Sequence, residues 1–132
     1  MANATESVAD VDHYELGRTL FDAGYYWEAH EAWEHRWIEL GRRGPQADCV
    51  KGLIKLAAAG VKVLAGQQDG AVRHATRCVE LLQTASTVSA VRPTDQMAAL
   101  QIAELYRQRP FTRVDADPWQ PTPLEAWQLR PC

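Results

Sequence analysis

Apolar residues recur every three or four positions along most of the chain, and no segment keeps the apolar–polar alternation of a half-buried strand. The pattern therefore predicts an all-α fold. Five helices are expected: 12 to 24, 25 to 40, 45 to a turn at 66–70, about 71 to 85, and 93 to a point before 110.

Local sequence signals mark several of these helix ends. Asp12 and Glu15 have the N-cap and N3 spacing of a capping box, and Pro45 is suited to the first turn of a helix. Gly41 and Gly44 provide a stop between the second and third helices. At 132 residues the chain is one helical domain, 1–132, with a single core.

The last segment, 110–132, has a different character. It holds five of the seven prolines together with Trp119 and Trp127. One interpretation is an extended, proline-rich C-terminal strap that buries its tryptophans on the bundle. The other is a tail that offers them to a partner. The strap is favoured, because soluble chains usually bury tryptophan within themselves.

Charge and cysteine content limit the function classes. The formal net charge is −3 and no dense basic run is present, so we expect no nucleic-acid binding. The most apolar stretch contains Lys55 and Lys62, which argues against a membrane span. Cys49, Cys78 and Cys132 are odd in number and far apart, as in a cytoplasmic protein with reduced thiols.

The helix over 25–40 carries the most informative pattern. At about 100° per residue, His30 and Glu34 fall in the middle of its apolar arc, while its other charged residues fall on the opposite face. The sequence thus predicts a His/Glu pair in an aromatic-lined pocket. The aromatic residues on the same arc are Tyr26, Trp27, Trp33 and Trp37.

Three roles are open to this pair, since burying it without partners would be costly. The two side chains would form a structural hydrogen-bond network, bind a divalent metal ion, or act as acid and base in a pocket. His35, five residues after His30, points to another side of the helix, so a zinc-protease pair is excluded. A third metal ligand would have to come from His13 or His74.

Lysines form a stripe on the helix that begins at 45. Lys51, Lys55 and Lys62 lie within about 40° of one another on the helical wheel. Either the stripe is solvated, or Lys55 or Lys62 forms a cross-helix ion pair with Glu34.

The stretch 21–37, FDAGYYWEAHEAWEHRW, followed by 51–59, KGLIKLAAA, and the Ala65–Gly66 turn, resembles the domain of unknown function 309 family. The resemblance covers about 17–82, which would be the family-like core. These small bacterial and plastid proteins are often labelled predicted metal-dependent hydrolases. The resemblance implies a compact, roughly orthogonal helical bundle.

The resemblance also implies a set of site residues and one departure. Where relatives tend to have Gln and His, this chain has Lys55 and Lys62, so a metal site would lose a ligand and gain a cation. The motif residues are Gly24, His30, Glu31, Glu34, Trp37, Gly52 and Leu53.

Two functions follow as expectations. The first is a cytoplasmic protein that binds a metal or a small molecule at the pocket, with His30 and Glu34 as metal ligands or catalytic groups if it is an enzyme. The second is a structural interaction module, a homodimer or a partner-binding domain, in which the pair is a buried hydrogen-bond network.

Overall fold

A computed structural model describes residues 11–84 and 90–108. Five helices and no strand are present in this part of the chain, which confirms the all-α prediction. The helices are α2 (His13–Asp22), α3 (Tyr26–Glu39), α4 (Pro45–Leu64), α5 (Gln68–Thr84) and α6 (Pro93–Gln108). The predicted strap over 110–132 lies outside the described residues.

The helix ends follow the signals in the sequence. The Asp12 side chain caps α2 by accepting a hydrogen bond from the Glu15 backbone N–H at 3.1 Å. Gly24 follows α2 with a φ of 91°, a conformation that glycine adopts without strain. One boundary differs: α5 begins at Gln68, inside the stretch expected to form the turn. The turn is shorter than expected because three residues, 65–67, join the two helices, with Gly66 at φ 73°.

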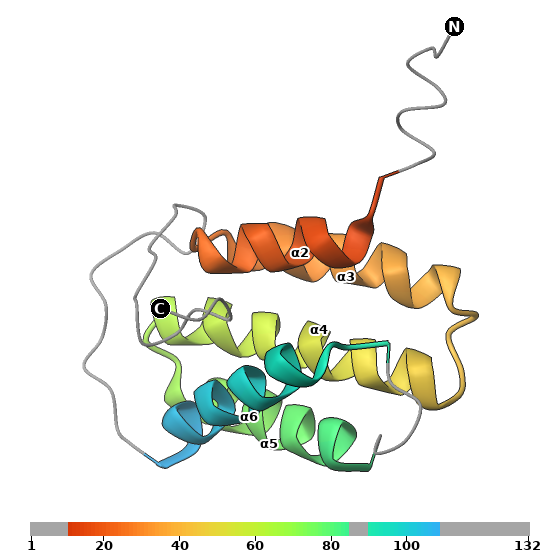
Figure 1. Ribbon diagram of the computed structural model, residues 1–132. Helices are drawn as coiled ribbons and strands as arrows, with labels where there is room; N and C mark the ends of the chain where they lie inside the picture. The colour runs from red at the N-terminus through yellow and green to blue at the C-terminus, as the bar shows by residue number, and fades with distance from the viewer. Residues whose placement is uncertain (1–10, 85–89, 109–132) are drawn as a thin grey trace, which may run out of the picture.

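Helix α4 is the centre of the bundle. It packs against α3 on one side and α5 on the other, α2 packs on α3, and α6 packs on α5 and the edge of α4. Figure 1 shows this order, with α2 and α3 on one side of α4 and with α5 and α6 on the other. Most α4 residues are buried, including the motif residues Gly52 and Leu53.

Two glycines allow the helices to approach closely where aromatic rings cross them. A Cβ on Gly60 would lie 2.9 Å from the Tyr26 ring, and one on Gly17 would lie 2.3 Å from the Trp33 indole. The Trp33 indole N–H also donates a hydrogen bond to the Tyr14 carbonyl at 3.0 Å. Tyr26 and Trp33, expected to line a pocket, are therefore fully buried parts of the core.

Two further findings bear on the sequence expectations. In the described residues, no helix combines the length and the apolar character needed to cross a bilayer. Cys49 and Cys78 are buried in the core and form no disulfide with a described residue, and burial raises the pKa of Cys78 to about 12. Cys132 lies outside the described ranges.

Candidate functional site

The buried face of α3 is not the one that the helical wheel predicts. Ala29 and Ala32 are buried with the aromatic core, whereas Glu34 is exposed and His30 is half-buried. The helix is turned by roughly a quarter turn, because small alanines let α3 pack closely against its neighbours. The prediction that His30 and Glu34 are both core residues is therefore wrong.

The rotation of α3 also changes the exposure of the other predicted site residues on this helix. Trp27 is 38% exposed, Glu31 is exposed and Trp37 is half-buried. The indole N–H of Trp37 is buried and has no hydrogen-bond partner among the described residues. The aromatic side chains of α3 thus divide between the core and the surface, and they do not enclose one pocket around the predicted pair.

His30 remains unusual at the edge of the core. Its ring stacks on the Trp27 indole, with centroids 5.2 Å apart and planes 3° from parallel. Its Nδ1 atom is buried and has no hydrogen-bond partner in the described part of the chain, so the predicted network with Glu34 does not form. Burial lowers the pKa of His30, and the charge of Lys55 lowers it further, against the raising effect of Glu34 and Glu31.

His74 on α5 lies at the meeting point of several basic side chains. Burial lowers its pKa, and the positive charges of Lys55, Lys62 and Arg73 lower it further, with a smaller contribution from His30. Basic groups on α3, α4 and α5 therefore lie near enough for their charges to act on His74. We call this set the basic cluster: His30, Lys55, Lys62, Arg73 and His74.

A hollow of about 380 Å³ opens beside the cluster at the turn between α4 and α5. Lys62 and Arg73 line it together with Asp69, and the Lys62 ammonium donates a hydrogen bond to the Gln67 side chain at 2.9 Å. A Cβ on Gly70 would lie 3.1 Å from Cδ of Lys62, so the lysine stem runs along this glycine. The remaining lining residues are Gln67, Gln68 and Gly70.

The cations of the cluster have no carboxylate partners. Across residues 11–84 and 90–108, none of Lys55, Lys62 and Arg73 lies within ion-pair distance of an Asp or Glu. The predicted cross-helix ion pair between Glu34 and Lys55 or Lys62 is therefore not formed. The Asp69 carboxylate lies in the hollow beside Lys62 and Arg73 but forms no ion pair with either of them.

The residues around His30 do not fit the metal site that the family resemblance implies. No group of three His, Cys, Asp or Glu side chains in the described ranges is placed to hold a metal ion. Glu34 is exposed, and the charged group facing His30 from α4 is the Lys55 ammonium, which repels a divalent cation.

His13, which the sequence offered as a third metal ligand, has contacts outside the basic cluster. It lies 3.0 Å from a Glu39 carboxylate oxygen and stacks on His35, with ring centroids 4.8 Å apart. It therefore ties the start of α2 to the end of α3. Of the two suggested third ligands, His74 is the one whose pKa is affected by His30.

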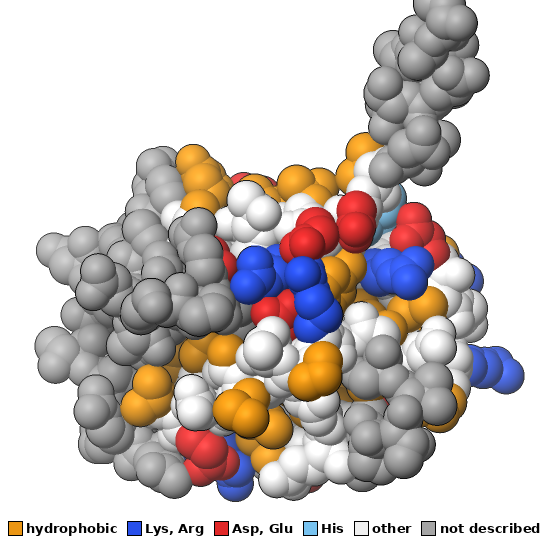
Figure 2. All heavy atoms as spheres, in the orientation of Figure 1, with side chains coloured by type: hydrophobic (Ala, Val, Ile, Leu, Met, Phe, Trp, Pro, Cys, Tyr) orange, Lys and Arg blue, Asp and Glu red, His pale blue; other side chains and the backbone are white. Residues whose placement is uncertain are grey.

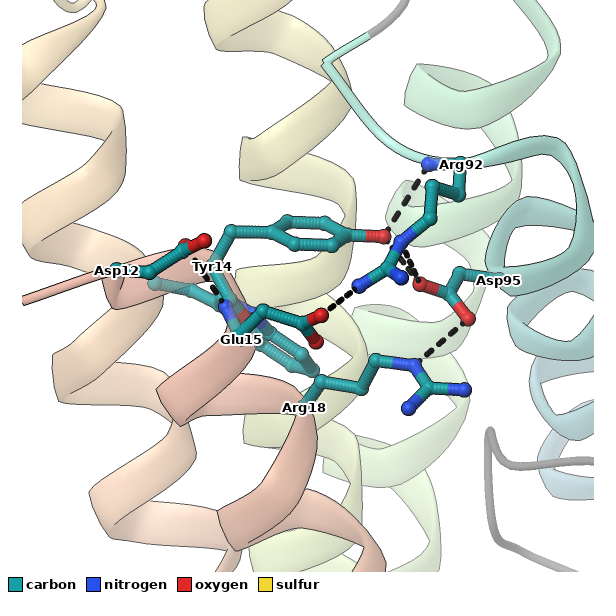
Figure 3. Close-up of polar contacts among 7 residues, drawn as sticks. Asp12, Tyr14, Glu15, Arg18, Arg92 and Asp95 are labelled. Atoms are coloured by element: carbon teal, nitrogen blue, oxygen red, sulfur yellow. Dashed lines mark hydrogen bonds and ion pairs between the residues drawn. The ribbon is translucent and has the colours of Figure 1, made fainter.

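A second polar group, which the sequence analysis missed, joins α2 to the start of α6 (Figure 3). Asp95 is 1% exposed and accepts hydrogen bonds from the Tyr14 hydroxyl and from Nε of Arg18, the latter at 2.9 Å. The Arg92 backbone N–H donates to the Tyr14 hydroxyl at 3.2 Å. We call Tyr14, Arg18, Arg92 and Asp95 the Asp95 network.

The outer edge of this network is exposed. The Arg92 guanidinium forms ion pairs with Glu15 at 2.5 Å and with Asp95 at 3.5 Å. Burial and the Asp95 contact raise the pKa of Tyr14 to about 12, so its hydroxyl stays protonated and donates to the carboxylate. Figure 2 shows acidic and basic side chains side by side over this region. Every charge in the network is paired, which is typical of a structural role.

Comparison with known proteins finds a family model that resembles part of the chain. The sequence model described as Domain of unknown function (DUF309) matches residues 14–74, from α2 into the first half of α5, so this segment is similar to that family. The resemblance seen in the sequence is thereby confirmed. The match includes His30, Lys55, Lys62, Arg73 and His74. No curated protein and no solved structure matches the chain.

Proposed function

We propose that this protein binds a small anion, a phosphate or carboxylate compound, at the basic cluster. The observation that carries the proposal is the meeting of three cations and two imidazoles from three helices, with no carboxylate paired to any of the cations in the described residues. Lys55 and Lys62 are half-buried and Arg73 is exposed, and like charges held near one another repel until an opposite charge joins them.

The hollow at the start of α5 supports the same ligand class. Lys62 and Arg73 face it from two helices, and the first backbone N–H groups of α5 have no partners within the helix. Arg73 offers a planar fork for two oxygen atoms, and Lys62 offers a compact charge. The Asp69 carboxylate in the hollow pairs with neither cation, so both are able to reach an anion.

The imidazoles extend the site toward α3. With lowered pKa values, His30 and His74 are uncharged at neutral pH and donate or accept hydrogen bonds instead of adding charge. The stacked Trp27 ring is 38% exposed and presents a flat apolar surface beside His30. A ligand with an anionic end and a planar or apolar part would satisfy both regions.

Titration with inorganic phosphate and with citrate tests the proposal. Binding is monitored by calorimetry and by NMR of the histidine ring signals. We expect saturable shifts of the His74 signal. In the double variant Lys62→Gln/Arg73→Gln the affinity should fall at least tenfold, which corresponds to about 1.4 kcal/mol. Arg43→Gln is the matched control, because Arg43 lies just before the opposite end of α4 and should leave binding unchanged.

Three results would overturn the proposal. One is the absence of any saturable change at His74 with either anion. Another is an equal loss of binding in the Arg43→Gln control, which would indicate general charge screening. Zinc and manganese are titrated in parallel. Stoichiometric metal binding that is lost in His30→Gln would replace the anion site with a metal site.

A further inference from the structure

The outward face of α6 is apolar and uncovered by the other described helices. Ala99, Ala103 and Tyr106 are fully buried, since α6 packs against α5 and α4. On the other side, Met97 is 64% exposed, the highest value of any large hydrophobic residue described. A groove of about 480 Å³ runs along this face, lined by Met97, Ala98, Leu100, Gln101, Ile102, Glu104 and Leu105.

The groove is almost free of charge. Its one carboxylate, Glu104, is already paired with Arg107 at 2.5 Å. Figure 2 shows hydrophobic side chains gathered over the part of the surface where α6 lies. A contiguous apolar surface of this kind on a small protein usually has an occupant.

We infer that the occupant is the chain's own C-terminal segment, 109–132, seated on α6 through its tryptophans. The segment follows α6 directly and is 24 residues long, and it contains Trp119 and Trp127. Tryptophan combines a large apolar surface with favourable contacts to methionine sulfur, which suits a groove that exposes Met97.

The length of the segment fits the groove. Met97 lies 11 residues before the end of α6, about 17 Å along the helix at 1.5 Å per residue. Trp119 follows Gln108 by 11 residues, which span up to about 34 Å in an extended, proline-rich conformation. The segment is therefore long enough to reach Met97 from the end of α6 and to cover the groove. Prolines reduce the conformational entropy lost on docking.

The chain provides its own probes for this inference. Met97 is the one methionine in the described ranges and Met1 is the only other in the sequence, so the Met97 methyl signal can be followed by NMR in the full chain. Cys49 and Cys78 are buried, so a spin label directed to Cys132 reports on the far end of the segment.

We expect the Met97 methyl signal to be shifted upfield by indole ring currents in the full-length protein. The variant Trp119→Ala/Trp127→Ala should move it toward the position of a solvent-exposed methionine, and should lower Tm. The Cys132 label should broaden signals of α6 within the same molecule. Met97→Glu should also lower Tm, whereas Ile38→Glu, at a 45% exposed position on α3, is the matched control and should change it little.

Three outcomes would overturn the inference. The first is a Met97 signal that keeps its position in the double tryptophan variant. The second is broadening that arises only between labelled and unlabelled molecules in a mixed sample, which would make a second copy the occupant. A Met97 shift that grows with protein concentration would point to the same conclusion. A null result in anion titration would leave this test unaffected, because the groove and the basic cluster are on different helices.

Discussion

The Asp95 network and the basic cluster differ in whether their charges have partners within the fold. In the network, one buried carboxylate is surrounded by a tyrosine hydroxyl and two guanidinium groups, so its charge is compensated within the fold. In the cluster, Lys55, Lys62 and Arg73 form no ion pair with any described carboxylate. The first arrangement is complete without a ligand, whereas the second is completed by an anion from outside. Charge is therefore informative about function mainly when it has no partner within the fold.

Asp95→Ala should have the largest effect of the changes considered. It removes the acceptor of the Tyr14 hydroxyl and of Arg18, and it releases the start of α6 from α2. Because Arg18 and Arg92 are partly solvated, the expected loss is about 2–4 kcal/mol of unfolding free energy, measured by urea denaturation.

Glu15→Ala is the control for this network, because Glu15 pairs with the same Arg92 at its exposed edge. It should cost less than about 1 kcal/mol. Equal effects of the two substitutions would show that the buried carboxylate is no more important than the surface ion pair. The anion affinity of the basic cluster should be unchanged in both variants.

Sequence reasoning located the helices because their ends are determined locally. The Asp12 cap, the glycine after α2 and Pro45 at the start of α4 act within a few residues of themselves. The predicted bounds of the turn before α5 were less accurate, since only residues 65–67 separate α4 from α5. An all-α bundle could therefore be predicted without knowledge of tertiary contacts.

The site was harder to predict, because its geometry depends on how α3 is rotated in the bundle. The helical wheel gave weight to large aromatic residues, but the buried face is set equally by Ala29 and Ala32. The Asp95 network was missed because Tyr14 and Asp95 are 81 residues apart in sequence. The lysines were identified, through the resemblance, as the departure that argues against a metal.

Stability below neutral pH should depend on the two cluster histidines. Both have pKa values below the ordinary 6.5 in the folded protein, so the unfolded chain binds protons more readily. Their contribution is fully present above about pH 6.5 and is lost as the pH falls through the lowered folded-state values. The variant His30→Gln/His74→Gln should lose less stability on acidification, by a few degrees in Tm between pH 7 and pH 5.

The control for this pH dependence is His35→Gln, which removes an exposed histidine from α3. Its acid sensitivity should match that of the unmodified protein. If the double variant and the unmodified protein lost Tm in parallel between pH 7 and pH 5, the lowered pKa values would have no role in acid stability. Saturating phosphate should reduce the acid sensitivity of the unmodified protein, because an anion favours protonated imidazoles.

Gly70→Ala should have the smallest effect on stability and the most specific effect on the cluster. Alanine favours the first turn of α5 over glycine by up to about 1 kcal/mol, but its Cβ would lie 3.1 Å from Cδ of Lys62. The lysine stem is flexible enough to move, so the fold should be maintained or slightly stabilised while the ammonium is displaced from the hollow. Urea denaturation should then show an equal or greater free energy of unfolding. Phosphate titration should show an affinity reduced a few-fold. Gln83→Ala, an exposed position near the end of α5, raises helix propensity without touching Lys62 and should leave affinity unchanged. An unchanged phosphate affinity in Gly70→Ala would mean that the position of Lys62 beside α5 is not what holds the anion.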